Sequence, residues 1–161
     1  MPFIAGPYTG TYNTNSLGQF EDGADLEFVH YDEEVRGDNF AQAVQDLITR
    51  GSDAFLSATL LEYNAAAMTA VAWPTHATFG RIGQVGRVSA SAIGGATIAK
   101  ETILTHVQGT TATNTPATLT LALSRLPPNF PIRLLFAPRL RRVPIRLQAL
   151  PNSSGVLFAA A

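Results

Sequence analysis

The sequence predicts a mainly β fold: one β-sandwich or barrel-like domain over residues 1–161, with a single flanking α-helix at about 64–73 and long loops. Two observations predict this class. Several short segments alternate apolar and polar residues, which is typical of strands with one buried face. Only residues 64–73 have a composition that plainly favours a helix. The length of 161 residues, with no internal repeat and no linker, indicates that these elements share one domain.

Two strands are expected near the start of the chain. Residues 8–12 alternate aromatic and small polar side chains, and residues 13–18 supply a turn. Residues 26–31 alternate between two faces, which predicts the second strand. The acidic residues 32–34 that follow are interpreted as a solvated loop or a strand end.

The next part of the chain contains an ambiguous segment, a strand and the helix. Residues 42–49 have apolar residues at helical spacing, but the segment is short and lies between two glycines. The apolar residues 55–61 predict a strand. Asn64 is a suitable N-cap for a helix rich in Ala over residues 65–73, and Pro74 ends it.

The second half of the chain is expected to be built from short strands. They lie around residues 88–93, 96–98, 102–107, 118–123 and 143–150. The last of these is followed by a turn at 151–155 and by apolar residues 156–158, which predicts a C-terminal hairpin. Pro144 restricts the beginning of its strand to a sheet edge or a strand start.

The composition is poor in charge for a soluble domain. Charged residues make up 14% of the chain, against about 25% in an average domain, and apolar residues make up 46%. The apolar content excludes a disordered chain, and no apolar run reaches the roughly 18 residues of a membrane span. The start of the chain lacks the basic and apolar stretches of a secretory signal. We expect further copies of the chain to cover its uncharged surface, which predicts a homo-oligomer and no membrane partner.

The charges divide unevenly along the chain. Residues 1–64 hold eleven acids and two arginines, a net charge of −9, whereas residues 65–161 hold one acid and nine bases, a net charge of +8. The halves either neutralise each other inside one fold or form an acidic and a basic face that attract copies head to tail. Nucleic acid binding by the basic half is a third interpretation, which the acidic half disfavours because it repels phosphate.

One basic cluster, within residues 139–146, is a candidate for a contact between subunits. It has no interleaved aromatic residues that could stack on bases. We favour a contact with acids of a neighbouring copy, and a solvated patch and nucleic acid binding are the alternatives. The candidate residues for this contact are Asp32, Glu33, Glu34, Arg139, Arg141, Arg142 and Arg146.

The sequence lacks the patterns of catalytic, cofactor and metal sites. No Gly-x-Ser-x-Gly elbow occurs, and the absence of cysteine excludes a thiolate nucleophile and a Cys-ligated zinc site. The acidic groups at 22–25 and 32–34 lack the spacing of a calcium loop. Glycines 94–95 lack the Lys-Ser/Thr ending that holds nucleotide phosphates, and His30 and His106 lie in strand patterns. We therefore expect a protein that is not an enzyme and that holds no cofactor or metal.

Segments at both ends of the chain carry a resemblance to a known family. In residues 6–23, GPYTGTYN and LGQFEDG place a short strand and a turn before an acidic-Gly step. The further segments are 37–46, 50–51, 60–64, 144–150 and 155–158. Together these segments resemble bacteriophage tail tube (major tail) proteins, over about residues 1–75 and the last 20 residues.

The resemblance implies a β-sandwich or barrel-like subunit that forms hexameric rings. Such rings stack head to tail into a hollow tube through which the genome passes. The implied partners are further copies of the chain, other phage tail proteins and, transiently, DNA. The implied location is the virion, in the phage tail, after assembly in the host cytoplasm.

Two other classes of function are weighed against this one. A capsid decoration protein, or another phage head or neck structural protein, shares the β content and the absence of a catalytic pattern. It would bind the shell as a monomer or trimer rather than stack. A β-sandwich ligand-binding module is less favoured, because one Trp and four Tyr offer few side chains for stacking on a sugar.

Overall fold

The computed structural model describes residues 8–36, 44–61, 64–72, 99–106, 117–131, 133 and 142–161. These residues contain seven strands and one helix: β1 (Tyr8–Tyr12), β2 (Asn15–Arg36), β3 (Val44–Leu60), α1 (Ala65–Ala72), β4 (Lys100–His106), β5 (Thr118–Arg125), β6 (Val143–Leu150) and β7 (Ala159–Ala160). The predicted mainly β class with one helix is confirmed. The strands expected at 88–93 and 96–98 lie outside the described residues.

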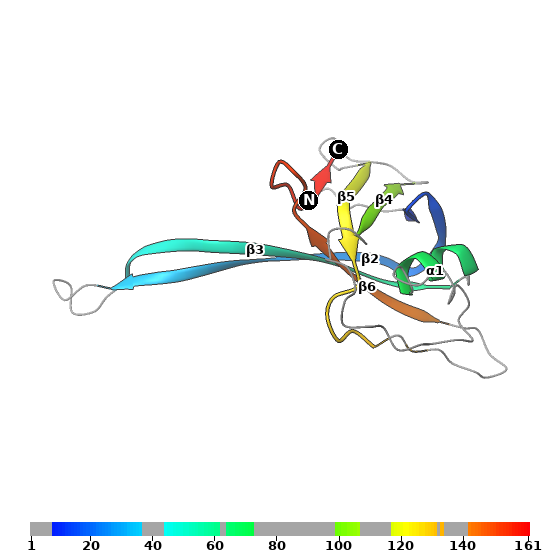
Figure 1. Ribbon diagram of the computed structural model, residues 1–161, viewed down its shortest axis with the longest axis horizontal. Coiled ribbons are helices and arrows are strands. Elements are labelled where there is room, and N and C mark those ends of the chain that lie inside the picture. The colour runs from blue at the N-terminus through cyan, green and yellow to red at the C-terminus, as the bar shows by residue number, and fades with distance from the viewer. Residues whose placement is uncertain are drawn as a thin grey trace, which may run out of the picture.

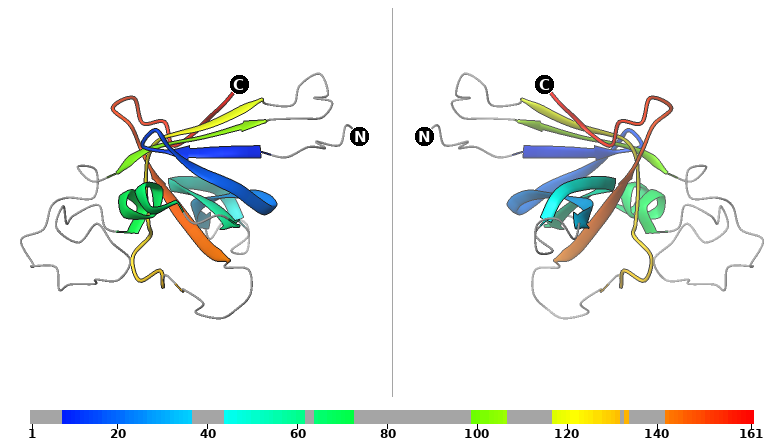
Figure 2. Two further views of the ribbon diagram at one scale, coloured as in Figure 1. Left: turned by 90° about the vertical axis from the view of Figure 1, so that its right-hand side faces the viewer. Right: turned by 90° about the vertical axis from the view of Figure 1, so that its left-hand side faces the viewer.

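Six of the strands close into an antiparallel barrel (Figure 1). The order around it is β4-β1-β2-β3-β6-β5, and pairing of β4 with β5 completes the ring. The short β7 is an additional strand that pairs with β5. Figure 2 views this body along the long axis of the molecule. Of the two architectures that the sequence left open, the structure is therefore a barrel.

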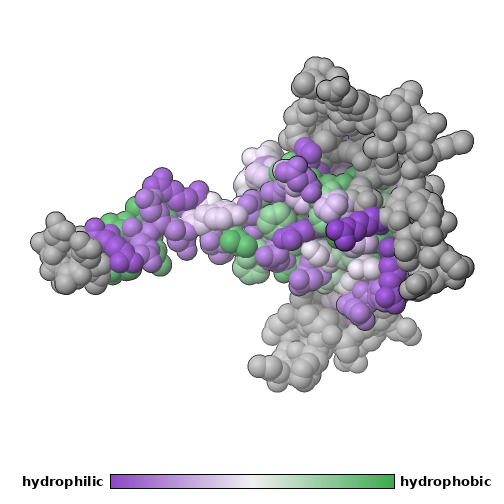
Figure 3. Space-filling view, turned by 90° about the horizontal axis from the view of Figure 1, so that it is seen from below, coloured by the Kyte–Doolittle hydropathy of each residue, from purple (hydrophilic) through white to green (hydrophobic). Residues whose placement is uncertain are grey.

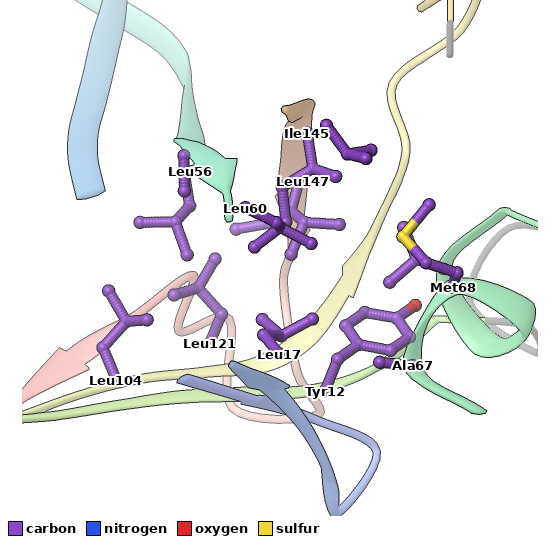
Figure 4. Packing of buried hydrophobic residues seen from close by; sticks show 14 of the residues in the cluster. Tyr12, Leu17, Leu56, Leu60, Ala67, Met68, Leu104, Leu121, Ile145 and Leu147 are labelled. Carbon is purple, nitrogen blue, oxygen red and sulfur yellow. The ribbon is translucent and has the colours of Figure 1, made fainter. Parts of the chain in front are cut away.

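The core fills the barrel with side chains from every wall strand and from the helix. Leu17, Leu60, Leu121 and Leu147 are essentially inaccessible to solvent and lie close together (Figure 4). Met68 of α1 lies beside them, so the helix closes the same cluster rather than forming a second core. This arrangement places α1 on the side of the barrel opposite the end from which β2 and β3 project (Figure 1).

Asn64 caps α1 as expected and also ties it to the barrel. Its Oδ1 accepts hydrogen bonds from the backbone N–H groups of Ala66 and Ala67, at 3.0 and 3.3 Å. Its Nδ2 donates to the carbonyl of Ser16 in β2, at 2.9 Å. The cap therefore satisfies helix donors and fixes where the helix lies on the sheet.

A buried polar network crosses the seam where β1, β4 and β5 meet. The Tyr12 hydroxyl donates to the carbonyl of Ser124, at 3.0 Å. The Ser124 hydroxyl donates to the carbonyl of Lys100, at 2.8 Å, so Thr102 must donate to the Ser124 oxygen, 2.6 Å away. Each buried hydroxyl thus has a partner, which the closure of the barrel requires.

Three expectations about local structure are wrong, and one ambiguous segment is resolved. Of the ambiguous residues 42–49, those from Val44 onwards are strand, because β2 supplies a ladder that overrides their helical spacing, and residues 42–43 lie outside the described residues. The acidic residues 32–34 lie inside β2, and the turn at 13–18 shrinks to two residues with positive φ, Asn13 and Thr14. Such a two-residue turn has the twist that joins hairpin strands tightly.

The third correction concerns the end of the chain. The turn exists, since the Asn152 side chain accepts hydrogen bonds from the backbone N–H groups of Ser154 and Val156, both at 2.9 Å. Residues 156–158 are not a strand, however, and β7 pairs with β5 rather than returning along β6. The outer edge of β6 is taken by β3, so the chain has to cross to another strand.

Gly10 occupies a position where a side chain would overfill the core, and we predict that Gly10→Ala destabilises the barrel. A Cβ atom there would approach Phe20 Cζ to 2.6 Å and Leu104 Cδ2 to 3.0 Å. We expect the free energy of unfolding to fall by about 1–3 kcal/mol in chemical denaturation. Gly51→Ala is the matched control, because nothing lies within 4 Å of its added Cβ. Equal stability of the two variants would contradict the packing described here.

Tyr12 makes the barrel sensitive to alkali. Burial raises the pKa of its hydroxyl from 10.0 to about 12 in the folded protein. The unfolded chain therefore releases this proton first, so the stability contributed is complete below pH 10 and falls as the pH rises towards about 12. Tyr12→Phe should lose about 1 kcal/mol at neutral pH, through the missing hydrogen bond. Between pH 10 and about 12 its free energy of unfolding should decline less than that of the parent.

Candidate assembly surface

The strands β2 and β3 continue far beyond the barrel as a two-stranded arm, residues 28–36 and 44–54 (Figure 1). The neighbouring strands do not follow them: β1 pairs with β2 only as far as Gln19, and β6 pairs with β3 only over residues 55–60. At about 3.4 Å per residue, the arm extends about 27 Å from Phe28 to Arg36.

The arm exposes apolar side chains that a folded chain normally buries. Leu47 is 56% exposed and Ile48 is 50% exposed, and Tyr31, Val35 and Val44 are exposed as well. In the space-filling view these apolar residues alternate with hydrophilic ones along the projection (Figure 3). A two-stranded ribbon is only marginally stable in water, and a row of exposed apolar residues marks an interaction site. The arm is therefore the candidate assembly surface.

Both faces of the arm carry apolar residues. Glu34 pairs with Leu47, and Glu33 pairs with Ile48. Directly paired residues share a face of a sheet and successive residues alternate, so Leu47 and Ile48 lie on opposite faces. A partner on one face alone would leave the other uncovered.

A groove lies at the base of the arm, where the ribbon leaves the barrel. We call it the root groove; its volume is about 480 Å³. Its lining includes Phe28, His30 and Ser52 from the arm, and Leu150, Leu157 and Phe158 from the end of the chain. The rings of Phe28 and Phe158 lie 6.0 Å apart, yet Phe28 remains 57% exposed.

The root groove contains a Ser–His contact that does not form a triad. His30 Nδ1 lies 2.7 Å from Ser52 Oγ. The adjacent carboxylate, Asp53, follows Ser52 in the strand and so points to the opposite face, where it accepts a hydrogen bond from Tyr31 at 2.9 Å. This bond raises the pKa of Tyr31. Asp53 therefore does not orient His30, as a nucleophilic triad would require.

A second groove, of about 560 Å³, lies beside the barrel. Glu21, Asp22 and Asp25 line it on one side, and Arg146 on the other. Within the described ranges, no three acidic or histidine side chains are grouped so that they could hold a metal ion.

The charged residues singled out from the sequence fall into two groups. The acids 32–34 lie on the arm, where Glu33 pairs with Arg50 and Glu34 with Arg36. Arg142 and Arg146 lie on the body, whereas Arg139 and Arg141 lie outside the described residues. The structure therefore does not bring 32–34 and 142–146 together within one subunit, and their contact between subunits stays a prediction.

Arg142 and Arg146 already form ion pairs with acids of their own chain. Arg146 Nη2 lies 2.8 Å from Glu27 Oε2, and Arg142 Nη2 lies 2.6 Å from Glu21 Oε1. Arg146 also stacks over the ring of Phe55, with the guanidinium carbon 4.4 Å from the ring centre. The acidic and basic halves of the sequence thus neutralise each other at these two places.

Sequence reasoning missed the arm, although the residues contained an indication of it. Val44, Ile48 and Thr49 are β-branched, which favours a strand over the helix that their spacing indicated. Their partners, Asp32 to Arg36, lie only 8 to 17 residues upstream, but this segment was interpreted as a loop or a strand end, so the pairing was not predicted.

The pair between Arg146 and Glu27 provides a test of internal neutralisation. We predict that Arg146→Glu lowers the free energy of unfolding by about 1 kcal/mol, because it replaces attraction with repulsion and removes the stacking on Phe55. Glu27→Arg in the same chain should restore part of the loss. Denaturant titration of the dilute protein measures both. A reversal that leaves stability unchanged would show that the pair contributes nothing to the fold.

Comparison with known proteins does not assign the chain to a family. No family model matches it, and no curated protein matches it. No helix in the described part of the chain is long and apolar enough to cross a membrane. The arm, the grooves and the distribution of charge are therefore the features that support a function.

Proposed function

We propose that the chain is a virion structural protein, a subunit of a bacteriophage tail tube that stacks as rings into a hollow conduit for the genome. The arm is the observation that carries this proposal. A closed barrel satisfies its own strand edges, but the arm leaves apolar side chains uncovered on both faces. Further copies of the chain could cover these side chains, because a structural protein that assembles from identical subunits is always surrounded by them.

The magnitude of the apolar burial favours an assembly in which every copy both gives and receives an arm. Complete burial of a large apolar side chain contributes roughly 1.5–3 kcal/mol, so half-exposed side chains gain about half of that. The six exposed large apolar residues of the arm therefore supply on the order of 5–9 kcal/mol, against roughly 4–15 kcal/mol lost on association; they are Phe28, Tyr31, Val35, Val44, Leu47 and Ile48. One arm barely offsets that loss. In a closed ring each subunit both gives and receives an arm, which doubles the contact.

The resemblance to tail tube proteins supports the same role from another side. Its first segments, 6–13 and 17–23, overlap β1, the tight turn and the start of β2, which form the barrel wall that leads into the arm. In this role the partners are further copies, other tail proteins and DNA in transit, and the location is the virion. Capsid decoration remains the alternative, and it predicts a small oligomer that does not stack.

Electron microscopy of the purified protein tests the proposal. In negative stain we expect rings or tubes with a central hole. Leu47→Asp combined with Ile48→Asp should abolish them, because it places charge on both faces of the arm. The fold should survive, since both side chains are about half exposed, and the free energy of unfolding should change by less than about 0.5 kcal/mol per site.

Thr49→Asp is the control for the added charge, since it places one of the two negative charges of the double variant at an exposed polar position of the same strand. This variant should assemble as the parent does. A compact monomer of the parent at high concentration in sedimentation would contradict the proposed function. A trimer that does not stack would favour the decoration role instead.

A further inference from the structure

Six of the seven exposed large apolar residues of the described chain gather in two places, and the seventh, Tyr31, lies on the arm between them. One is the outer part of the arm, which we call the arm tip: Val35, Val44, Leu47 and Ile48. The other is the root groove, where Phe28 is 57% exposed; Val156, 43% exposed, lies between Gly155 and Leu157, which both line the groove. Among the described residues, neither surface is fully covered by its own chain.

The two surfaces cannot meet within one copy. Pairing between β2 and β3 runs from Phe28 and Ala54 to Arg36 and Val44. Along this ladder Val35 lies about 24 Å from Phe28, and Ile48 lies about 14 Å from Ser52, so the ladder keeps the arm tip away from the root groove and prevents the arm from folding back. The same two surfaces are free to meet between copies.

We propose that the arm tip of one copy binds in the root groove of the next, an inference that rests on the proposed self-assembly. The groove, at about 480 Å³, has room for several aliphatic side chains of the tip. Its exposed aromatic floor, Phe28 beside Phe158, offers the apolar surface that Leu47 and Val44 need. Each copy has one tip and one groove, so the contact is heterologous and repeats from copy to copy.

Charge favours the same arrangement. The sequence from 28 to 54 contains six acids and two arginines, a net charge of −4. The rest of the chain contains six acids and nine bases, a net charge of +3. Two arms therefore repel each other, which disfavours pairing of tip with tip, whereas the rest of another copy carries the opposite net charge.

Disulfide cross-linking tests the contact directly, because the chain has no cysteine. Leu47→Cys and Val156→Cys are prepared as separate full-length variants with different tags, mixed under assembling conditions and oxidised. A disulfide requires Cα atoms within roughly 7 Å, so it forms only where tip and groove meet. We expect about tenfold more mixed dimer than from Leu47→Cys combined with Glu101→Cys, an exposed position on β4 outside both surfaces.

The possible outcomes separate this inference from the proposed function. Rings or tubes that form without the 47–156 cross-link overturn the inference and leave the proposed function standing. Dominant cross-linking between two Leu47→Cys copies overturns it too, in favour of arms that pair with each other. Failure of the parent to assemble at any concentration overturns both. In a second variant, Val156→Asp, assembly should be lost while the melting temperature stays that of the parent, and normal assembly of this variant would overturn the inference.

Discussion

The ladder between β2 and β3 carries both parts of the molecule, since its first pairs build the barrel wall and its last pairs form the arm. From Phe20 and Leu60 to Arg36 and Val44 the same two strands stay paired, through three irregularities in register. Their inner end is sealed by β1, β6 and the core, which includes the nearly inaccessible Leu60. Among the described residues, the outer end is held by its own ladder and by ion pairs between exposed side chains, which contribute about 0–1 kcal/mol each. The arm therefore depends on the barrel for its stability, because a two-stranded ribbon on its own is only marginally stable.

Sequence patterns predicted the elements whose structure is decided locally. Residues 8–12 and 143–150 alternate strictly, and Asn64 is followed by a run that favours a helix, so each of these segments needs little information from elsewhere. The failures share a different cause. Residues 44–49 became strand because β2 lies beside them, and β7 pairs with β5 because β3 already occupies β6. Choice of a strand partner is a property of the whole topology, which short-range periodicity does not encode.

The contacts of the charged candidate residues also depend on which strands are neighbours, and so they could not be predicted from the sequence. The division of charge between the two halves of the chain was visible in the sequence, but which charges meet depends on the barrel order. Because β6 lies next to β3, and β3 next to β2, Arg146 comes to face Glu27 across two strand spacings. The acids 32–34 could not be placed in the same way, since their strand had been interpreted as ending before them. Counted by the arm, the charge divides between residues 28–54, with a net charge of −4, and the rest of the sequence, with a net charge of +3.

The acids of the arm also bear on the proposed contact between copies. An exposed strand edge invites uncontrolled pairing with other chains, and charged residues and bulges are the usual protection against it. Asp32, Glu33 and Glu34 follow one another along β2, and the register of β3 shifts opposite Tyr31 and again opposite Val35. These features weaken pairing at the edges but leave Leu47 and Ile48 accessible on the faces. An arm of this kind is suited to binding by its faces in a shaped groove, where apolar contact supplies affinity and the surrounding charge determines which surface it meets.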